Sequence, residues 1–241
     1  MRRILLLALA LLLTLACSGL GVWQLRRLSA RQAANRLALS ARELPTLVPD
    51  SATAALAANR RAQLSGRLDE AREFLLRGRL VQGVPAVLVI TPLRLPGNDT
   101  AILVNRGYVP APDAVDPGKA TWSERDRTAF QGVLLAVPNR GDGAPLRHGG
   151  RESWKSLDLS AMQARLPYPL AAVYLVAEPD PGGVAHTVRG REYPFRAEPP
   201  ALDEGPHLMY AVQWFGIAAA VAAFAFFFVW RVGPSRASTY C

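Results

Sequence analysis

Residues 4–25 read ILLLALALLLTLACSGLGVWQL, a run of 22 residues without a charged side chain. A second uncharged run of 26 residues, rich in Ala, Phe and Val, occupies positions 205–230. Because about 20 apolar residues in a helix cross the hydrocarbon core of a bilayer, each run is long enough to span a membrane. We predict transmembrane helices at 4–25 and 207–230, which would form a hairpin with both ends of the chain on one side.

The first run also has features of a cleaved export signal. Arg2 and Arg3 precede a leucine-rich stretch, and Thr14-Leu15-Ala16-Cys17 approaches a lipoprotein cleavage box. The uncharged run nevertheless continues for eight residues past Cys17. That length exceeds the need of a signal peptide, so we expect an uncleaved anchor and keep a lipoprotein as the alternative.

The distribution of charge predicts the orientation of the chain. The protein has 241 residues and a net charge of +9, and all 19 acidic residues lie between Glu43 and Glu204. The short tails, 1–3 and 231–241, are basic, which suits the cytoplasmic face of a membrane and argues against a groove for nucleic acid. We therefore predict cytoplasmic tails, an exported domain at 26–206 and contact with membrane lipid.

The central segment has the pattern of a β-rich domain. Residues 86–90 and 101–104 are apolar runs rich in β-branched residues, and Pro92 together with Pro96-Gly97-Asn98-Asp99 separates them, which indicates a hairpin. We predict further strands at 63–68, 73–77, 129–137 and 171–176, helices at 29–41 and 159–166, and loops at 138–150 and 178–200. The predicted fold is an α+β membrane protein whose two transmembrane helices flank one β-rich exported domain.

No pattern in the sequence indicates an enzyme. Cys17 and Cys241 have no neighbour at the spacing of a metal or redox motif, and the three histidines (His148, His186 and His207) are widely scattered. The sequence patterns of serine hydrolases, nucleotide-binding loops and zinc proteases do not occur. We therefore expect that the protein catalyses no reaction.

Three short motifs are more specific than these general features. The first, Gly21-x-Trp23-Gln24-x-x-Arg27, ends the first apolar run, and the second is Asn105-Arg106-Gly107-Tyr108-Val109-Pro110. The third, His207-x-x-Tyr210-Ala211-x-Gln213-Trp214, opens the second apolar run. In this order, and with Thr91-Pro92-Leu93 before the second motif, they resemble the Surfeit locus protein one family of membrane-bound assembly factors for cytochrome c oxidase. Tyr108 departs from the family, which usually has tryptophan there.

The resemblance covers the whole chain and implies a function. It implies a bacterial inner-membrane protein that receives haem a and aids its insertion into the catalytic subunit of a haem–copper cytochrome c oxidase. Its partners would then be oxidase subunits, with haem a synthase as a further candidate. Two alternatives remain: a membrane-anchored scaffold that stabilises oxidase subunits without binding haem, and an exported enzyme of unknown chemistry.

The third motif has the chemistry of a haem ligand. Pro206 suits the first turn of a helix, and His207, Tyr210 and Trp214 then follow at i, i+3 and i+7 on one face. Neutral imidazole ligates haem iron, so His207 is the predicted metal ligand, with the two aromatic side chains able to stack on a porphyrin. The alternative is an interfacial belt of aromatic residues without a ligand.

The other two motifs add candidate cofactor-binding residues. Trp23 and Gln24 are expected beside the second helix, where they would complete a pocket, although a tryptophan at the end of a span also suits the interface alone. In the second motif, Gly107 and Pro110 suggest a structural role in a strand that leads into a turn. Arg106 is the residue of this motif most able to bind a ligand or a partner, by pairing with a haem propionate or a partner carboxylate.

Overall fold

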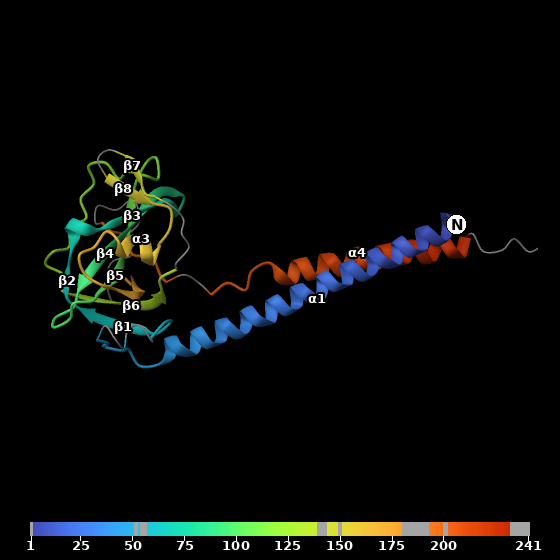
Figure 1. Ribbon diagram of the computed structural model, residues 1–241, viewed down its shortest axis with the longest axis horizontal. Helices are drawn as coiled ribbons and strands as arrows, with labels where there is room; N and C mark the ends of the chain where they lie inside the picture. Colours follow the sequence, from blue (N-terminus) through green and yellow to red (C-terminus); the bar gives the residue numbers. More distant parts are fainter. Residues whose placement is uncertain are drawn as a thin grey trace, which may run out of the picture. The chain divides into compact units, whose positions relative to one another are not determined.

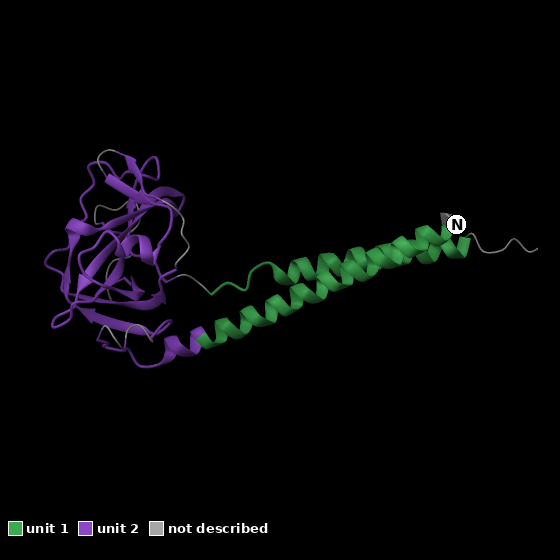
Figure 2. Cartoon of the chain, in the orientation of Figure 1, with its two compact units in different colours: residues 1–37, 202–241 green, residues 38–201 purple. Residues whose placement is uncertain are grey.

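The computed structural model describes residues 2–50, 53, 57–138, 144–148, 151–179, 193–199 and 202–231. The chain separates into two compact units (Figure 2). The helical unit comprises residues 1–37 and 202–241, and the sheet unit comprises residues 38–201. The sheet unit is shorter than the predicted domain at 26–206 because the first helix continues well beyond the apolar run.

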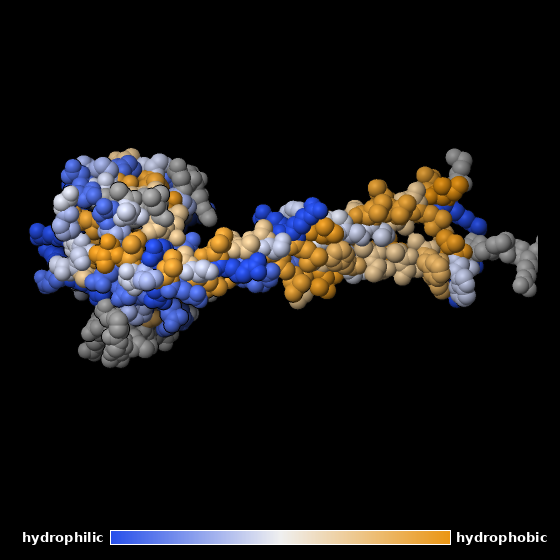
Figure 3. All heavy atoms as spheres, turned by 90° about the horizontal axis from the view of Figure 1, so that it is seen from below, coloured by the Kyte–Doolittle hydropathy of each residue, from blue (hydrophilic) through white to orange (hydrophobic). Residues whose placement is uncertain are grey.

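The helical unit consists of α1 (Arg2–Glu43), whose last residues belong to the sheet unit, and α4 (His207–Arg231). Helix α1 is uninterrupted, as the prediction of a helix at 29–41 continuing from the span required, but it already includes Arg2 and Arg3 of the predicted tail. Both helices are long and apolar enough to cross a membrane. Apolar side chains cover most of their surface (Figure 3), which is consistent with membrane association.

The sheet unit contains a mixed nine-stranded sheet within the described residues. Its elements (Figure 1) are β1 (Arg61–Ser65), β2 (Arg67–Leu68), η1 (Glu70–Arg72), β3 (Phe74–Val81), β4 (Val84–Arg94), β5 (Ala101–Pro110), β6 (Ala129–Ala136), β7 (Leu146–His148), β8 (Arg151–Trp154), α3 (Leu159–Gln163) and β9 (Leu170–Ala177). The strand order is β1-β6-β9-β5-β4-β3-β8-β7, with β2 paired to β4. β5 is parallel to β9 and β3 to β8, and the other pairs are antiparallel.

The central strand β5 is buried on both faces. Ile102 and Val104 pack into one apolar cluster, whereas Ala101 and Leu103 pack into a second cluster that includes Met162 of α3. Successive side chains of a strand point to opposite faces, so a strand covered on both sides carries a continuous apolar run. This is the pattern from which the strand was predicted.

Pro92 does not separate two strands as predicted, because it lies inside β4. The carbonyl oxygen of Pro92 accepts a hydrogen bond from the backbone N–H of Asp69 at 2.8 Å. On that side of β4, pairing with β3 ends at Ile90 and pairing with β2 begins at Leu93. The N–H that proline lacks therefore removes no bond from the sheet.

The other local predictions are confirmed in part. The helix predicted at 159–166 is α3, and the Asp158 side chain caps it by accepting a hydrogen bond from the N–H of Ala161. The predicted loop at 138–150 contains β7, and β8 was not predicted at all. Most of the loop predicted at 178–200, with His186, lies outside the described residues, and so do 232–241 of the predicted C-terminal tail.

Candidate functional site

The helical unit pairs α1 and α4 in opposite directions. Gln24 of α1 contacts His207 at the start of α4, and Gly21 faces Phe215. A Cβ atom on Gly21 would lie 2.7 Å from the Phe215 ring, closer than real contacts allow. Glycine at the first position of the first motif therefore lets α4 approach α1 closely.

Gln24 orients the imidazole of His207. The Gln24 Oε1 atom lies 2.9 Å from His207 Nδ1, and both side chains are partly buried. In the neutral tautomer that donates its Nδ1–H to this amide oxygen, the lone pair of the ring lies on Nε2. This is the arrangement that prepares histidine as a metal ligand, in which a hydrogen bond to the second ring nitrogen sets the tautomer and the ring orientation.

Polar side chains of α1 hold the segment that leads into α4. The buried Asn35 amide donates to the carbonyl oxygens of Leu202 and Asp203, each at 3.2 Å. Arg31 Nε donates to the same Asp203 oxygen at 3.0 Å, and Gln32 donates to Glu204 Oε2 at 3.1 Å. These bonds fix the chain immediately before His207.

A cavity of about 390 Å³ lies beside His207. Its lining residues come from both helical segments: Arg27, Ala30, Arg31, Ala34, Asp203, Glu204, Gly205 and His207. The space next to Nε2 depends on Gly205, since a Cβ atom there would lie 3.4 Å from the His207 Nε2 and Cδ2 atoms. Gly205 and His207 thus border the cavity together.

The charges around this cavity are not paired with one another. The Asp203 Oδ1 atom accepts the Gly205 N–H at 2.9 Å, and Glu204 accepts the Gln32 amide. Within the described part of the chain, neither Arg27 nor Arg31 has a carboxylate oxygen within the 4.0 Å of an ion pair. Both guanidinium groups are exposed, and that of Arg27 lies 5.9 Å from the centre of the Trp23 ring.

The aromatic residues of the motifs do not line the cavity. Trp23 is 52% exposed and Tyr210 is 47% exposed, whereas Trp214 is partly buried. Their place at the ends of the apolar helices agrees equally with an interfacial belt. Of the predicted residues, the structure brings His207 and Gln24 together and leaves the three aromatic side chains outside their cavity.

Arg106 belongs to the sheet unit and is enclosed there. It is the extra residue of a β-bulge, since Val89 pairs with Gly107 while Ile90 pairs with Asn105. The whole residue is 0% exposed. Its guanidinium group bonds Glu124 at 2.9 Å, Glu70 at 3.2 Å, Glu73 at 3.4 Å, Thr91 Oγ1 at 3.2 Å and the Trp122 carbonyl oxygen.

These contacts correct the prediction that Arg106 binds a haem propionate. Five acceptors of its own chain surround the guanidinium group, and solvent does not reach it. The bond to Thr91 also joins two of the sequence motifs, Thr91-Pro92-Leu93 and Asn105–Pro110. Both motifs therefore serve the packing of the sheet unit.

Gly107 makes the bulge possible. Its φ is +122°, and a Cβ atom would lie 2.3 Å from the carbonyl oxygen of Phe195. Phe195 exchanges two backbone hydrogen bonds with Tyr108, both at 2.8 Å. Only glycine fits this backbone conformation and this close approach.

Two of the glutamates around Arg106, Glu70 and Glu73, have opposed pKa shifts. Burial acts to raise the pKa of Glu70, but hydrogen bonds from the Glu124 N–H and Ser123, together with the charge of Arg106, outweigh it and leave that pKa lowered. Burial raises the pKa of Glu73 by more than its Trp122 hydrogen bond and Arg106 lower it. Glu70 is thus the firmer counter-ion of Arg106.

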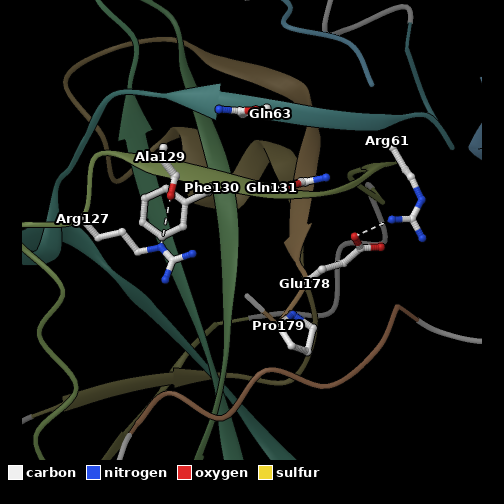
Figure 4. A pocket seen from close by; sticks show the side chains of 8 residues that line it. All are labelled: Arg61, Gln63, Arg127, Ala129, Phe130, Gln131, Glu178 and Pro179. Atoms are coloured by element: carbon white, nitrogen blue, oxygen red, sulfur yellow. Dashed lines mark hydrogen bonds and ion pairs between the residues drawn. The ribbon is translucent and has the colours of Figure 1, made fainter. Parts of the chain in front are cut away.

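Two further cavities among the described residues have linings of other kinds. One of about 400 Å³ beside β1 and β6 (Figure 4) is crossed by an ion pair between Arg61 and Glu178 at 2.8 Å. One of about 390 Å³ between α1 and α4 is lined by apolar side chains such as Leu9 and Phe224. Among the described residues, no group of three or more His, Cys, Asp or Glu residues could hold a metal ion.

The fold and the site define a class of protein: a mixed-sheet domain carried between two apolar terminal helices, with an oriented histidine where the second helix begins. The chain belongs to the SURF1 family, whose model matches residues 11–219. It is 26% identical to the Surfeit locus protein 1 of Takifugu rubripes over 88% of this chain and 92% of that protein. A SURF1-like protein of Mycobacterium bovis is 31% identical over 74% of this chain and 64% of the relative.

The sequence reasoning quoted Arg27 only as the end of the first motif and missed Arg31 and Asn35 beyond it. Arg27, Arg31 and Asn35 follow one another at intervals of four residues, and Gln24 precedes Arg31 by seven. Residues at these intervals share one face of a helix. This spacing is visible in the sequence, but only the contacts with residues 202–207 show that this face of α1 holds the segment before α4.

Proposed function

We propose that this protein is an assembly factor for a haem–copper cytochrome c oxidase and that it binds haem a through His207. The hydrogen bond between Gln24 and His207 carries the proposal, because it engages Nδ1 of an imidazole that borders a cavity where α4 begins. Membership of the family supports the oxidase as the target. Oxidase subunits, with haem a synthase as a possible donor, are then the partners.

The residues present fit part of a haem and not the whole of it. The haem would supply the iron that accepts the imidazole nitrogen. His207 would hold the iron, Gln24 would keep the ring in position, and Arg27 and Arg31 line the same cavity as that ring. The flat face of a porphyrin has no aromatic partner within this cavity, so stacking by Trp23, Tyr210 or Trp214 is not part of the proposal.

The proposed setting is the inner membrane of a bacterium. Both apolar helices would span it, with the ends of the chain in the cytoplasm and the sheet unit in the periplasm, as the basic tails suggest. A reporter active only in the cytoplasm and fused after Cys241 should then be functional, whereas the same reporter inserted in 141–150 should be silent. The opposite pattern would refute this orientation.

The test of haem binding uses the full chain, purified from a host that makes haem a. The parent should show a Soret band, and His207→Ala should lose it while its membrane insertion and its yield stay unchanged, because alanine suits a helix. Gln24→Ala should weaken haem binding about 10- to 100-fold, as is typical when the group that orients a ligand is removed.

His148→Ala is the matched control, because that imidazole is exposed on β7 and lies 3.7 Å from Asp113. It should leave the spectrum unaltered. If His207→Ala purifies with the haem content and spectrum of the parent, the haem proposal is refuted. The protein would then be better described as a membrane-anchored scaffold for oxidase subunits, a role that its half-exposed Trp23 and Tyr210 also suit.

A further inference from the structure

We propose that Arg27 and Arg31 form a carboxylate-binding subsite beside His207, which takes the propionate groups of the tetrapyrrole. The inference rests on the proposed function and adds the substrate group that the helical unit recognises. It also assigns to two arginines of α1 the propionate binding that the sequence suggested for Arg106.

The first argument is position. Arg27 and Arg31 are one helical turn apart on α1 and line the same cavity as His207. They lie just beyond the apolar run, at the level where α4 begins. A ligand with an apolar body and carboxylate groups at one edge would place that edge at this level.

The second argument is the state of the charges. Two carboxylates also line the cavity, and neither pairs with these arginines: Asp203 accepts the Gly205 N–H and Glu204 accepts the Gln32 amide, neutral donors that leave both negative charges in place. Arg31 uses its Nε atom to hold the Asp203 carbonyl oxygen, and this bond restrains the side chain without neutralising it. A guanidinium group held in this way presents its remaining N–H groups to an incoming carboxylate.

The third argument is the contrast with Arg106, whose guanidinium group already has three carboxylates. A saturated arginine offers nothing to a ligand. At Arg27 and Arg31 a ligand carboxylate would meet no competing carboxylate at ion-pair distance among the described residues.

The experiment compares protoporphyrin IX, which is free of iron and has two propionates, with its dimethyl ester. Each is titrated by fluorescence against the full chain in nanodiscs of zwitterionic lipid. The double variant Arg27→Gln/Arg31→Gln should bind the diacid about 10- to 100-fold more weakly and the diester unchanged, because each charge-assisted contact is worth about tenfold. Each ligand is compared between variant and parent, so that its partition into lipid cancels.

The matched control is Arg26→Gln, an exposed arginine of the same helix that does not line the cavity, and it should leave both affinities unchanged. An equal loss for diacid and diester would show that the arginines act on packing, and unchanged affinities for both ligands would show that the arginines do not meet the propionates. Either result overturns the inference. Displacement of the diacid by phosphatidylglycerol would overturn it too, since the arginines would then serve lipid phosphate.

A parallel titration with haemin separates this inference from the proposed function. If His207→Ala loses the Soret signature of haemin but keeps the preference for the diacid, both the ligand and the subsite are supported. If His207→Ala leaves the haemin spectrum unchanged while the double variant loses the preference, the iron ligand is refuted and the subsite stands.

Discussion

Arginine has opposite settings in the two units of this protein. In the sheet unit, Arg106 is completely buried and bonds Glu70, Glu73 and Glu124. In the helical unit, Arg27 and Arg31 are exposed at a cavity in which the acidic residues bond other groups. The same side chain is a structural element in one unit and an available cation in the other.

The comparison shows that sequence motifs and binding residues need not coincide. Arg106 is part of a motif but has no free capacity, whereas Arg31 is outside every motif that the sequence analysis singled out and lies next to the candidate ligand. Burying a charge is tolerated only where it is paired and hydrogen-bonded, so a fully buried arginine already has its partners. An arginine can instead bind a ligand carboxylate where, as at Arg27 and Arg31, no carboxylate of the described chain pairs with it.

The largest expected effect comes from removing the buried cation. Arg106→Met should lower the free energy of unfolding by about 3–5 kcal/mol, because it leaves three glutamates without their shared partner. Arg125→Gln is the control: Arg125 also pairs with Glu70, but its side chain is 81% exposed, and its loss should cost less than about 1 kcal/mol. Urea unfolding of the full chain in detergent measures both, and equal losses would contradict the structural role of Arg106.

A smaller loss of stability is expected when the β-bulge that positions Arg106 is disturbed. Gly107→Ala should cost about 2–3 kcal/mol, since strain at positive φ adds to a clash with the Phe195 carbonyl oxygen. Gly118→Ala is the control: its φ is also positive, at +61°, but it has open space around its Cα atom, so the change should cost only about 1–2 kcal/mol. The thermal midpoints of the two variants test the difference, and the reverse order would refute the close approach at Gly107.

The third prediction uses pH to distinguish two glutamates of the Arg106 cluster. The pKa of Glu70 is lowered in the folded protein, so its stabilising effect is present above its unfolded value, near 4.5, and is lost as the pH falls further. Glu70→Gln should therefore cost about 2 kcal/mol at pH 7 and progressively less below pH 4.5.

The pKa of Glu73 is shifted in the opposite direction, so its effect on stability changes with pH in the opposite way. Because burial raises its pKa, the folded protein favours the protonated form, and this contribution is lost as the pH rises through the folded pKa. Glu73→Gln should therefore be less destabilising than Glu70→Gln at pH 7. Unfolding curves of the two variants between pH 3 and pH 8 provide the measurement, and parallel curves would refute the assignment.

The smallest expected effect is in the helical unit. Asn35→Ala should cost about 1 kcal/mol, because it removes two hydrogen bonds from the segment before α4. Amide hydrogen exchange in 202–207 should accelerate, and haem affinity should fall several-fold as His207 becomes less well placed. Ser29→Ala, at an exposed position that bonds only its own helix, is the control and should change neither quantity.

Local patterns in the sequence predicted most elements correctly. The two apolar runs, the strands from 63 to 104 and the capped helix after Asp158 are confirmed, because each depends on residues close together in the chain. The prediction at Pro92 was wrong since a proline is tolerated where one neighbouring strand ends and another begins. That arrangement depends on strand pairing, which no local pattern specifies.

The sequence by itself determined two helices able to span a membrane, a β-rich domain between them, and the family, because hydrophobic length, alternation and ordered motifs are properties of the linear chain. Only the tertiary structure decided which polar residues are already satisfied. It enclosed Arg106 among three glutamates that lie up to 36 residues away, and it brought Gln24 to His207 across 183 positions. Hydrogen bonds and ion pairs act over a few ångströms, so the capacity of a side chain for a ligand follows from its neighbours in space and not from its neighbours in sequence.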